Sequence, residues 1–169
     1  QIHNAISDQF NKRMVIKEYL ALAWGNIEDK GEIEGQIGRN PRKRQYFTMV
    51  ESGGRTSFTK YELLESLRPL SLVKLYPKTG RTHQLRVHLK SIGHPIFCDE
   101  AYGGGKKKAR SFHVKYTQLI NRLIKSINRV ALHAQLLEIT HPATGKKITF
   151  KAPIPQDMQT TLDILKNEK

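Results

Sequence analysis

The amino-acid sequence predicts an α+β fold, in which helices pack on a mixed, largely antiparallel sheet. Two observations lead to this expectation. Segments with the alternating pattern of strands occur near the beginning, in the middle and near the end of the chain, and segments with helical spacing precede, separate and follow them. Strands and helices do not alternate one by one, as they would in a parallel sheet. At 169 residues the chain is one ordinary domain in length.

The first half of the chain is predicted to consist mainly of strands. Helical spacing over residues 4–12 precedes the segment "VIKEYLALAWG", which alternates as a strand does. Gly53-Gly54 is a hairpin signal, and a Gly-Arg-Asn-Pro loop divides the segment before it. The expected strands are residues 15–25, short pieces of 31–50, 56–67 and 70–77.

The second half is predicted to mix helices with a last pair of strands. A helix over residues 82–92 follows a Thr-Gly-Arg turn, with Thr82 as its N-cap, and a long loop follows that helix. The remaining expected elements are a helix at 114–127, strands at 131–139 and 148–152, and a helix from about Gln156 to Lys166.

The charge of the chain points to a polyanionic partner. Lysine and arginine total 29 against 15 acidic residues, which gives a formal net charge of +14. That surplus is too large to be neutralised in surface ion pairs, so nucleic acid is expected, with a merely basic surface as the alternative. No membrane partner is expected, because the basic residues do not gather on one amphipathic helix and no apolar run approaches the ~20 residues of a membrane span. The single cysteine, Cys98, excludes an internal disulfide and favours the cytoplasm.

The predicted helix at 82–92 carries more polar groups than a buried helix tolerates without partners. Leu85, Leu89 and Ile92 form its apolar face, and Arg86 lies at the edge of that face. An arginine at such a boundary suits a carboxylate or phosphate at the wall of a cleft. The alternative is a surface arginine whose stem covers leucines.

No metal site is expected from the histidines. His83 and His88 are five residues apart, so on a helix they point about 140° away from each other. The chain has no H-E-x-x-H motif, and one cysteine cannot build a cysteine-rich zinc site. The run "GGGKKK" at 103–108 lacks the spacing of a phosphate-binding Walker loop.

Several stretches together resemble the RluA/RluD-type pseudouridine synthases, which isomerise uridine in RNA. They are "TGRTHQLRVHL", "GHPIFCDEAYGG" and "RVALHAQLLEITHPATGKKITFKAPIPQDM", with "VIKEYLALAWG" and "IGRNPRKRQYFTMV" in the same order as in that family. The resemblance runs from about residue 10 to 165 and leans towards the ribosomal-RNA branch. It implies a pseudouridine synthase-like fold, an RNA substrate (ribosomal RNA, with transfer RNA possible), and an isomerisation that needs no cofactor.

The resemblance also assigns roles to three residues. Tyr19 matches the tyrosine that stacks on the target base and assists removal of the C5 proton. Arg86 matches the arginine that pairs with the catalytic aspartate and would hold it ionised. Leu137 matches the apolar residue under the base, although Leu136 is adjacent. A uracil modified at C5 must first be flipped out and held, which these groups suit.

The family's nucleophilic aspartate, in a motif like H-R-L-D-x-x-T-S-G, has no counterpart in this sequence. The aspartates present are Asp8, Asp29, Asp99, Asp157 and Asp163, all in other settings. Residues 1–169 are therefore expected to be a single partial catalytic domain that is inactive alone, with the nucleophile motif and any N-terminal RNA-binding domain upstream. Cys98 stands where the family usually has glycine.

Basic residues, together with the polar residues that follow Arg81, supply the candidate RNA contacts. The candidates are Arg39, Arg42, Lys43, Arg44, Arg81, Thr82, His83, Gln84, Lys106 and Lys107. If six of them meet phosphates, log affinity should fall with log salt with a slope of roughly −4 to −5. Two other functions stay open at this point: a non-catalytic basic RNA-binding module, and an RNA hydrolase that uses histidine as a general base.

Overall fold

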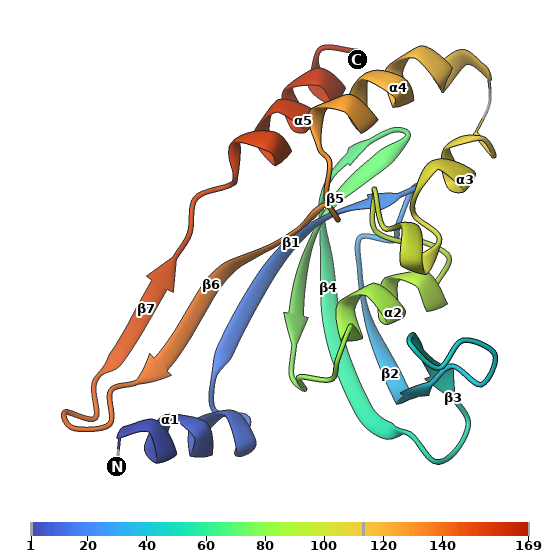
Figure 1. Ribbon diagram of the computed structural model, residues 1–169. Coiled ribbons are helices and arrows are strands. Elements are labelled where there is room, and N and C mark those ends of the chain that lie inside the picture. The colour runs from blue at the N-terminus through green and yellow to red at the C-terminus, as the bar shows by residue number, and fades with distance from the viewer. Residues whose placement is uncertain (1, 113, 169) are drawn as a thin grey trace.

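A computed structural model of the chain describes residues 2–112 and 114–168, and it confirms the α+β class. Within these residues a seven-stranded sheet has the order β3-β2-β4-β5-β1-β6-β7, and every pairing of neighbours in it is antiparallel. The strands are β1 (Ile16–Trp24), β2 (Lys30–Arg39), β3 (Phe47–Val50), β4 (Arg55–Leu67), β5 (Leu70–Pro77), β6 (Leu132–Thr140) and β7 (Lys147–Lys151). The helices are α1 (Ile2–Asn11), α2 (Gln84–Ser91), α3 (Lys106–Ala109), α4 (Thr117–Ser126) and α5 (Gln156–Lys166) (Figure 1).

The core forms around β1, because this strand lies between β5 and β6 and is apolar on both faces near its end. Leu20 to Trp24 are all buried. Trp24 packs against Phe97 and Phe112, and its indole Nε1 donates a hydrogen bond to the Gly104 carbonyl at 2.6 Å. Leucines of α2, α4 and α5 join the same core. The α2 helix is thereby fixed against the sheet, with its strand neighbours mainly on β2, β3 and β4.

The hairpin predicted at Gly53-Gly54 is wrong. β3 and β4 do not pair with each other; Gln36 of β2 pairs with Val50 on one side and with Thr56 on the other. The connection therefore crosses over β2, and the crossing needs glycine. A Cβ added to Gly54 would lie 2.6 Å from the Val50 side chain and 3.0 Å from the Ile37 carbonyl carbon. The glycine pair predicted that the chain turns here, but it did not predict that the strands on either side of the turn pair with β2 and not with each other.

The start of α2 also differs from the prediction, because Thr82 is not its N-cap. His83 occupies the N-cap position, with φ at 57° in the left-handed region and no capping hydrogen bond from its side chain. Gln84 holds the preceding turn instead. Its Oε1 accepts from the Arg81 amide at 3.0 Å and from the Thr79 hydroxyl at 2.7 Å.

The long loop predicted after α2 contains short helical turns: a 3-10 turn at Glu100–Tyr102 and the helix α3. Cys98 in this loop has φ at 60°. A left-handed residue favours glycine, which accounts for the glycine that the resembling family usually has there. Burial raises the pKa of the Cys98 thiol to about 11, so it is not a nucleophile near neutral pH. No helix in the described residues is long and apolar enough to cross a membrane.

His88 of α2 is fully buried, and its imidazole lies 2.8 Å from the Ser57 hydroxyl. Its Nδ1 has no hydrogen-bond partner among the residues that the structure describes. Burial lowers the pKa of His88 from 6.5 to about 4, so the unfolded chain binds the proton first as the pH falls.

We therefore expect His88 to make the protein sensitive to acid. Its contribution to the free energy of unfolding is complete above pH 6.5 and is lost between pH 6.5 and about 4, by about 3 kcal/mol. Urea unfolding at pH 7.5 and pH 4.5 tests this in the wild type and in His88→Gln. The variant should lose about 2 to 3 kcal/mol less than the wild type between the two pH values, since pH 4.5 lies just above the end of the titration. An equal loss in both proteins would contradict the assignment.

Candidate functional site

A cleft of 240 Å³ lies between β1, the 77–83 loop and α2, and it brings two of the predicted catalytic residues together. We call it the β1–α2 cleft. Tyr19 projects from β1, and Arg86 projects from the first turn of α2. The lining residues are Lys17, Tyr19, Pro77, Thr79, Gly80, Arg81, His83, Gln84, Leu85, Arg86 and Leu132.

Tyr19 is half-buried at an irregularity in the sheet. The register of β1 against β6 shifts between Glu18 and Tyr19, where Gln135 of β6 is left without an opposite residue. Such bulges bend a strand and re-aim its side chains. Lys17, two residues earlier, lines the cleft beside Tyr19. Burial lowers the pKa of Lys17, and within the described residues its ammonium has no carboxylate partner.

Arg86 is held by a carboxylate inside the chain. Its Nε donates to Asp99 Oδ2 and its Nη2 donates to Asp99 Oδ1, each at 2.7 Å. The Asp99 side chain is 0% exposed and that of Arg86 is 20% exposed. The hydrogen bonds to Asp99 raise the pKa of Arg86 further above its ordinary value, so the guanidinium stays charged at any working pH. Nη1 makes no hydrogen bond in the described part of the chain, which leaves it for a further anion.

A second layer of contacts fixes this ion pair. The guanidinium of Arg86 lies over the buried Tyr102 ring, 4.5 Å from its centre. The Tyr102 hydroxyl accepts from the Phe47 amide at 3.1 Å and lies 2.8 Å from Nδ1 of His83. Partial burial, and then the charge of Arg86, lower the pKa of His83. A neutral His83 protonated at Nε2 accepts a hydrogen bond from the Tyr102 hydroxyl at Nδ1, which matches this geometry.

Sequence reasoning missed Asp99 as the partner of Arg86. The arginine was expected to pair with the nucleophile, and Asp99 was recognised only as a different aspartate of its motif. Two features of the sequence pointed towards Asp99. It lies in the turn-forming stretch "CDEAYGG", and it follows Arg86 by only 13 residues. Neither reveals a bidentate pair, because the pair depends on how the turn folds back onto α2.

The predicted apolar residue, Leu137, lies on β6 opposite Lys17, beyond the residues that line the cleft. Leu132 and Leu85 supply the apolar wall instead. Leu132 pairs with Ala21, and because opposite residues of an antiparallel pair point to one face, it lies on the side of Tyr19. The register places Leu136 opposite Glu18 on the other face, whereas Leu137, opposite Lys17, lies on the Tyr19 side as Leu132 does but further along β6.

The predicted RNA contacts fall into separate groups. Arg39, Arg81 and Thr82 line a second cavity next to the cleft, together with Arg55, which the sequence did not single out. Arg42, Lys43 and Arg44 are exposed in the loop between β2 and β3, and Lys106 and Lys107 are exposed at the start of α3. His83 lines the cleft.

The predicted RNA contact by Gln84 is not supported by its geometry. Gln84 is 4% exposed. Its Nε2 donates to the Phe58 carbonyl and to the Thr59 hydroxyl, and its Oε1 accepts from the 79–81 turn. Its amide is used entirely within the fold, so it shapes the cleft.

A third hollow, of 260 Å³, adjoins the cleft and shares Lys17 and residues 79–81 with it. Arg13 and Lys78 are its other cations. Among residues 2–112 and 114–168, no group of three histidine, cysteine, aspartate or glutamate side chains is placed to hold a metal ion. The surroundings of the cleft are thus cationic, and its own ionisable groups are the Tyr19 phenol, the His83 imidazole, the Lys17 ammonium and the guanidinium groups of Arg81 and Arg86.

Comparisons with known proteins agree with this arrangement. The family model described as RNA pseudouridylate synthase matches residues 1–91. An uncharacterised RNA pseudouridine synthase of Chlorobaculum parvum is 38% identical over 162 residues, covering 94% of this chain and 49% of the relative. The ribosomal large subunit pseudouridine synthase D of Neisseria meningitidis serogroup B is 36% identical over 166 residues, covering 98% of this chain and 42% of the relative.

Solved structures give the same result. Human RNA pseudouridylate synthase domain containing 1 superposes with a TM-score of 0.68 at 30% identity, covering 94% of this chain and 63% of that one. Human RNA pseudouridylate synthase domain containing 4, at 22% identity and a TM-score of 0.69, shares the fold over 95% of this chain and 66% of that one. The chain spans about half the length of the curated relatives that it matches. The family match and the shared fold together show that this chain belongs to the RNA pseudouridylate synthase family.

Proposed function

We propose that the full-length protein carrying this chain is an RNA pseudouridine synthase that isomerises uridines of large-subunit ribosomal RNA in the cytoplasm. One observation carries the proposal: Tyr19 and Arg86 line a single cleft. The relatives named as ribosomal large subunit pseudouridine synthases support the choice of ribosomal over transfer RNA.

The cleft offers what a flipped uridine needs. The ring of Tyr19 is a surface on which the base stacks, and Leu85 and Leu132 form an apolar wall beside it. Isomerisation breaks the N1–C1′ bond and forms a C5–C1′ bond, while the C5 proton is lost and N1 gains one. No group is transferred and no net oxidation occurs, so no cofactor enters the proposal.

We also propose that residues 1–169 are part of the catalytic domain and that a preceding segment supplies the nucleophilic aspartate. Asp99 is unsuitable as the nucleophile, because its side chain is buried and both oxygens bind Arg86. Asp157 pairs with Arg129. The unused Nη1 of Arg86 is the group that would bind the incoming carboxylate and hold it ionised. The 169-residue chain alone is then inactive.

Tritium release from RNA labelled at uridine C5 tests the proposal. The full-length protein should release tritium from unmodified large-subunit ribosomal RNA and leave the length of the RNA unchanged. RNA binding without release would favour a non-catalytic RNA-binding module. Shortened RNA would favour a hydrolase. Equal release from ribosomal and transfer RNA would contradict the preference for ribosomal RNA.

A further inference from the structure

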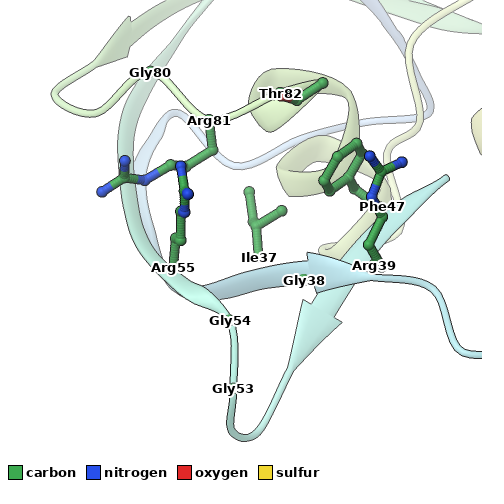
Figure 2. A pocket seen from close by; sticks show the side chains of 10 residues that line it. All are labelled: Ile37, Gly38, Arg39, Phe47, Gly53, Gly54, Arg55, Gly80, Arg81 and Thr82. Carbon is green, nitrogen blue, oxygen red and sulfur yellow. The ribbon is translucent and has the colours of Figure 1, made fainter. Parts of the chain in front are cut away.

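Beside the β1–α2 cleft lies a larger cavity, of 420 Å³, which we call the arginine pocket. Strand β2, the connection between β3 and β4, and the 80–82 loop enclose it (Figure 2). Gly80 and Arg81 line both cavities, so the 80–82 loop is their common wall. The residues used below are Ile37, Arg39, Phe47, Arg55 and Arg81.

The pocket carries unneutralised positive charge. Arg39, Arg55 and Arg81 line it, and no acidic residue does. Arg39 donates to the Arg44 carbonyl at 3.0 Å and Arg81 donates to the Thr56 carbonyl at 3.0 Å. Within residues 2–112 and 114–168, none of the three forms an ion pair with a carboxylate. Guanidinium groups that line a pocket without a carboxylate partner suit an anion from outside, since they bind phosphate with planar, paired hydrogen bonds.

One side of the pocket is a stacking surface. The guanidinium of Arg39 lies over the Phe47 ring, 4.5 Å from its centre. Phe47 is fixed in turn, because its amide donates to the Tyr102 hydroxyl and its ring meets His83 edge-on at 5.9 Å. A guanidinium stacked on an aromatic ring is a flat cationic surface on which nucleobases stack.

The two kinds of group stand on opposite sides of an apolar floor. In Figure 2, Arg39 and Phe47 flank one side of the pocket, Arg55 and Arg81 flank the other, and Ile37 lies between them. Ile37 is 4% exposed. A stacking surface, an apolar floor and facing cations match the base and the phosphate of one nucleotide.

We propose that the arginine pocket binds a second unpaired nucleotide of the RNA, next to the uridine in the β1–α2 cleft. The base stacks on Arg39, and the phosphodiester that crosses the 80–82 loop binds Arg55 and Arg81. This inference rests on the proposed function for the identity of the neighbouring nucleotide. The enzyme would then bind unpaired nucleotides in both cavities, one on each side of the 80–82 loop.

The charge of the pocket is tested by binding, with no need for turnover. The full-length protein is titrated with a fluorescein-labelled oligouridylate of ten nucleotides at several salt concentrations. Arg55→Gln should weaken binding by about tenfold and reduce the slope of log affinity against log salt by about 0.7, the value for one lost phosphate contact. The matched control is Lys151→Gln, which removes one charge from exposed β7 at the opposite edge of the sheet and should bind as the wild type does.

The stacking surface is tested with an abasic oligomer of the same length. The wild type should bind oligouridylate more tightly than the abasic oligomer by about tenfold or more, because stacking of a base contributes roughly that much. Arg39→Lys keeps the charge but loses the planar group, so it should reduce this preference while its affinity for the abasic oligomer is unchanged.

Three results would overturn the proposal: wild-type binding by Arg55→Gln, equal weakening by Lys151→Gln, or an undiminished base preference in Arg39→Lys. Absence of oligouridylate binding by the wild type would also overturn it. A failure of the proposed function gives a different result. If the variants bind as expected but the wild type releases no tritium from labelled RNA, nucleotide binding by the pocket is supported and the isomerase activity is contradicted.

Discussion

Replacing Arg86 with alanine is expected to abolish turnover of the full-length protein while its affinity for RNA changes less than about threefold. The guanidinium is the only cation of the β1–α2 cleft that a buried aspartate clamps in place, and its Nη1 is the group left for the nucleophilic carboxylate. Without it that carboxylate loses its orientation and the charge that keeps it ionised. The rate of tritium release should fall by at least about 1,000-fold, since an interaction that stabilises the transition state is lost.

The controls separate this effect from unfolding. Arg86→Ala leaves Asp99 buried without its partner, so its folding must be verified by circular dichroism and thermal unfolding. Arg86→Lys keeps a charge beside Asp99 but cannot form the bidentate pair, and it should also be strongly impaired. Lys90→Ala, on the exposed face of the same helix, should retain wild-type turnover. Full activity of a folded Arg86→Ala protein would remove Arg86 from the mechanism.

Replacing Asp99 with asparagine is expected to lower both stability and turnover. Asp99 is 0% exposed and is the carboxylate that positions Arg86. Asparagine keeps the acceptor for the Tyr102 amide, 3.2 Å from Oδ1, but removes the negative charge. Breaking a buried ion pair on one side costs about 3 kcal/mol or more, because the remaining charge is left uncompensated. Urea unfolding should show this loss.

A matched control defines what an ordinary ion pair contributes in this protein. Glu32 binds Lys60 at 2.6 Å between neighbouring strands, and its side chain is 54% exposed. Glu32→Gln should therefore lower the free energy of unfolding by less than about 1 kcal/mol. The positioning role of Asp99 predicts more than lost stability: under conditions in which the variant is fully folded, kcat falls and KM is nearly unchanged. A stable Asp99→Asn protein with normal kcat would show that the pair does not position Arg86.

The sequence predicted the elements that have strong periodicity or clear ends. Residues 70–77 and 156–166 form the strand and the helix that were expected. Alternation at 15–25 predicted β1. In the structure its first half is partly exposed and Leu20 to Trp24 are buried on both faces. Only the family resemblance predicted that Tyr19 and Arg86 belong to one site. The structure explains their meeting, because Leu85 and Leu89 of α2 join the same buried core as the end of β1.

The errors share one physical cause, since each depended on contacts between segments that are distant in sequence. The Gly53-Gly54 pair allows a close crossing over β2, and local turn chemistry cannot distinguish such a crossing from a hairpin. Thr82 has the side chain of an N-cap, yet the turn is fixed by Gln84 reaching to β4.

The central claim is that the β1–α2 cleft holds the uridine during isomerisation, and the single-turnover rate of tritium release by Tyr19→Leu tests it most directly. Leucine removes both the stacking ring and the hydroxyl, whereas Tyr76→Leu, on β5 outside the cleft, provides the matched control. The account predicts a rate at least about 100-fold below the wild type for Tyr19→Leu, the effect of losing a group that assists proton transfer, and a rate near the wild type for Tyr76→Leu. A wild-type rate in Tyr19→Leu would contradict the account.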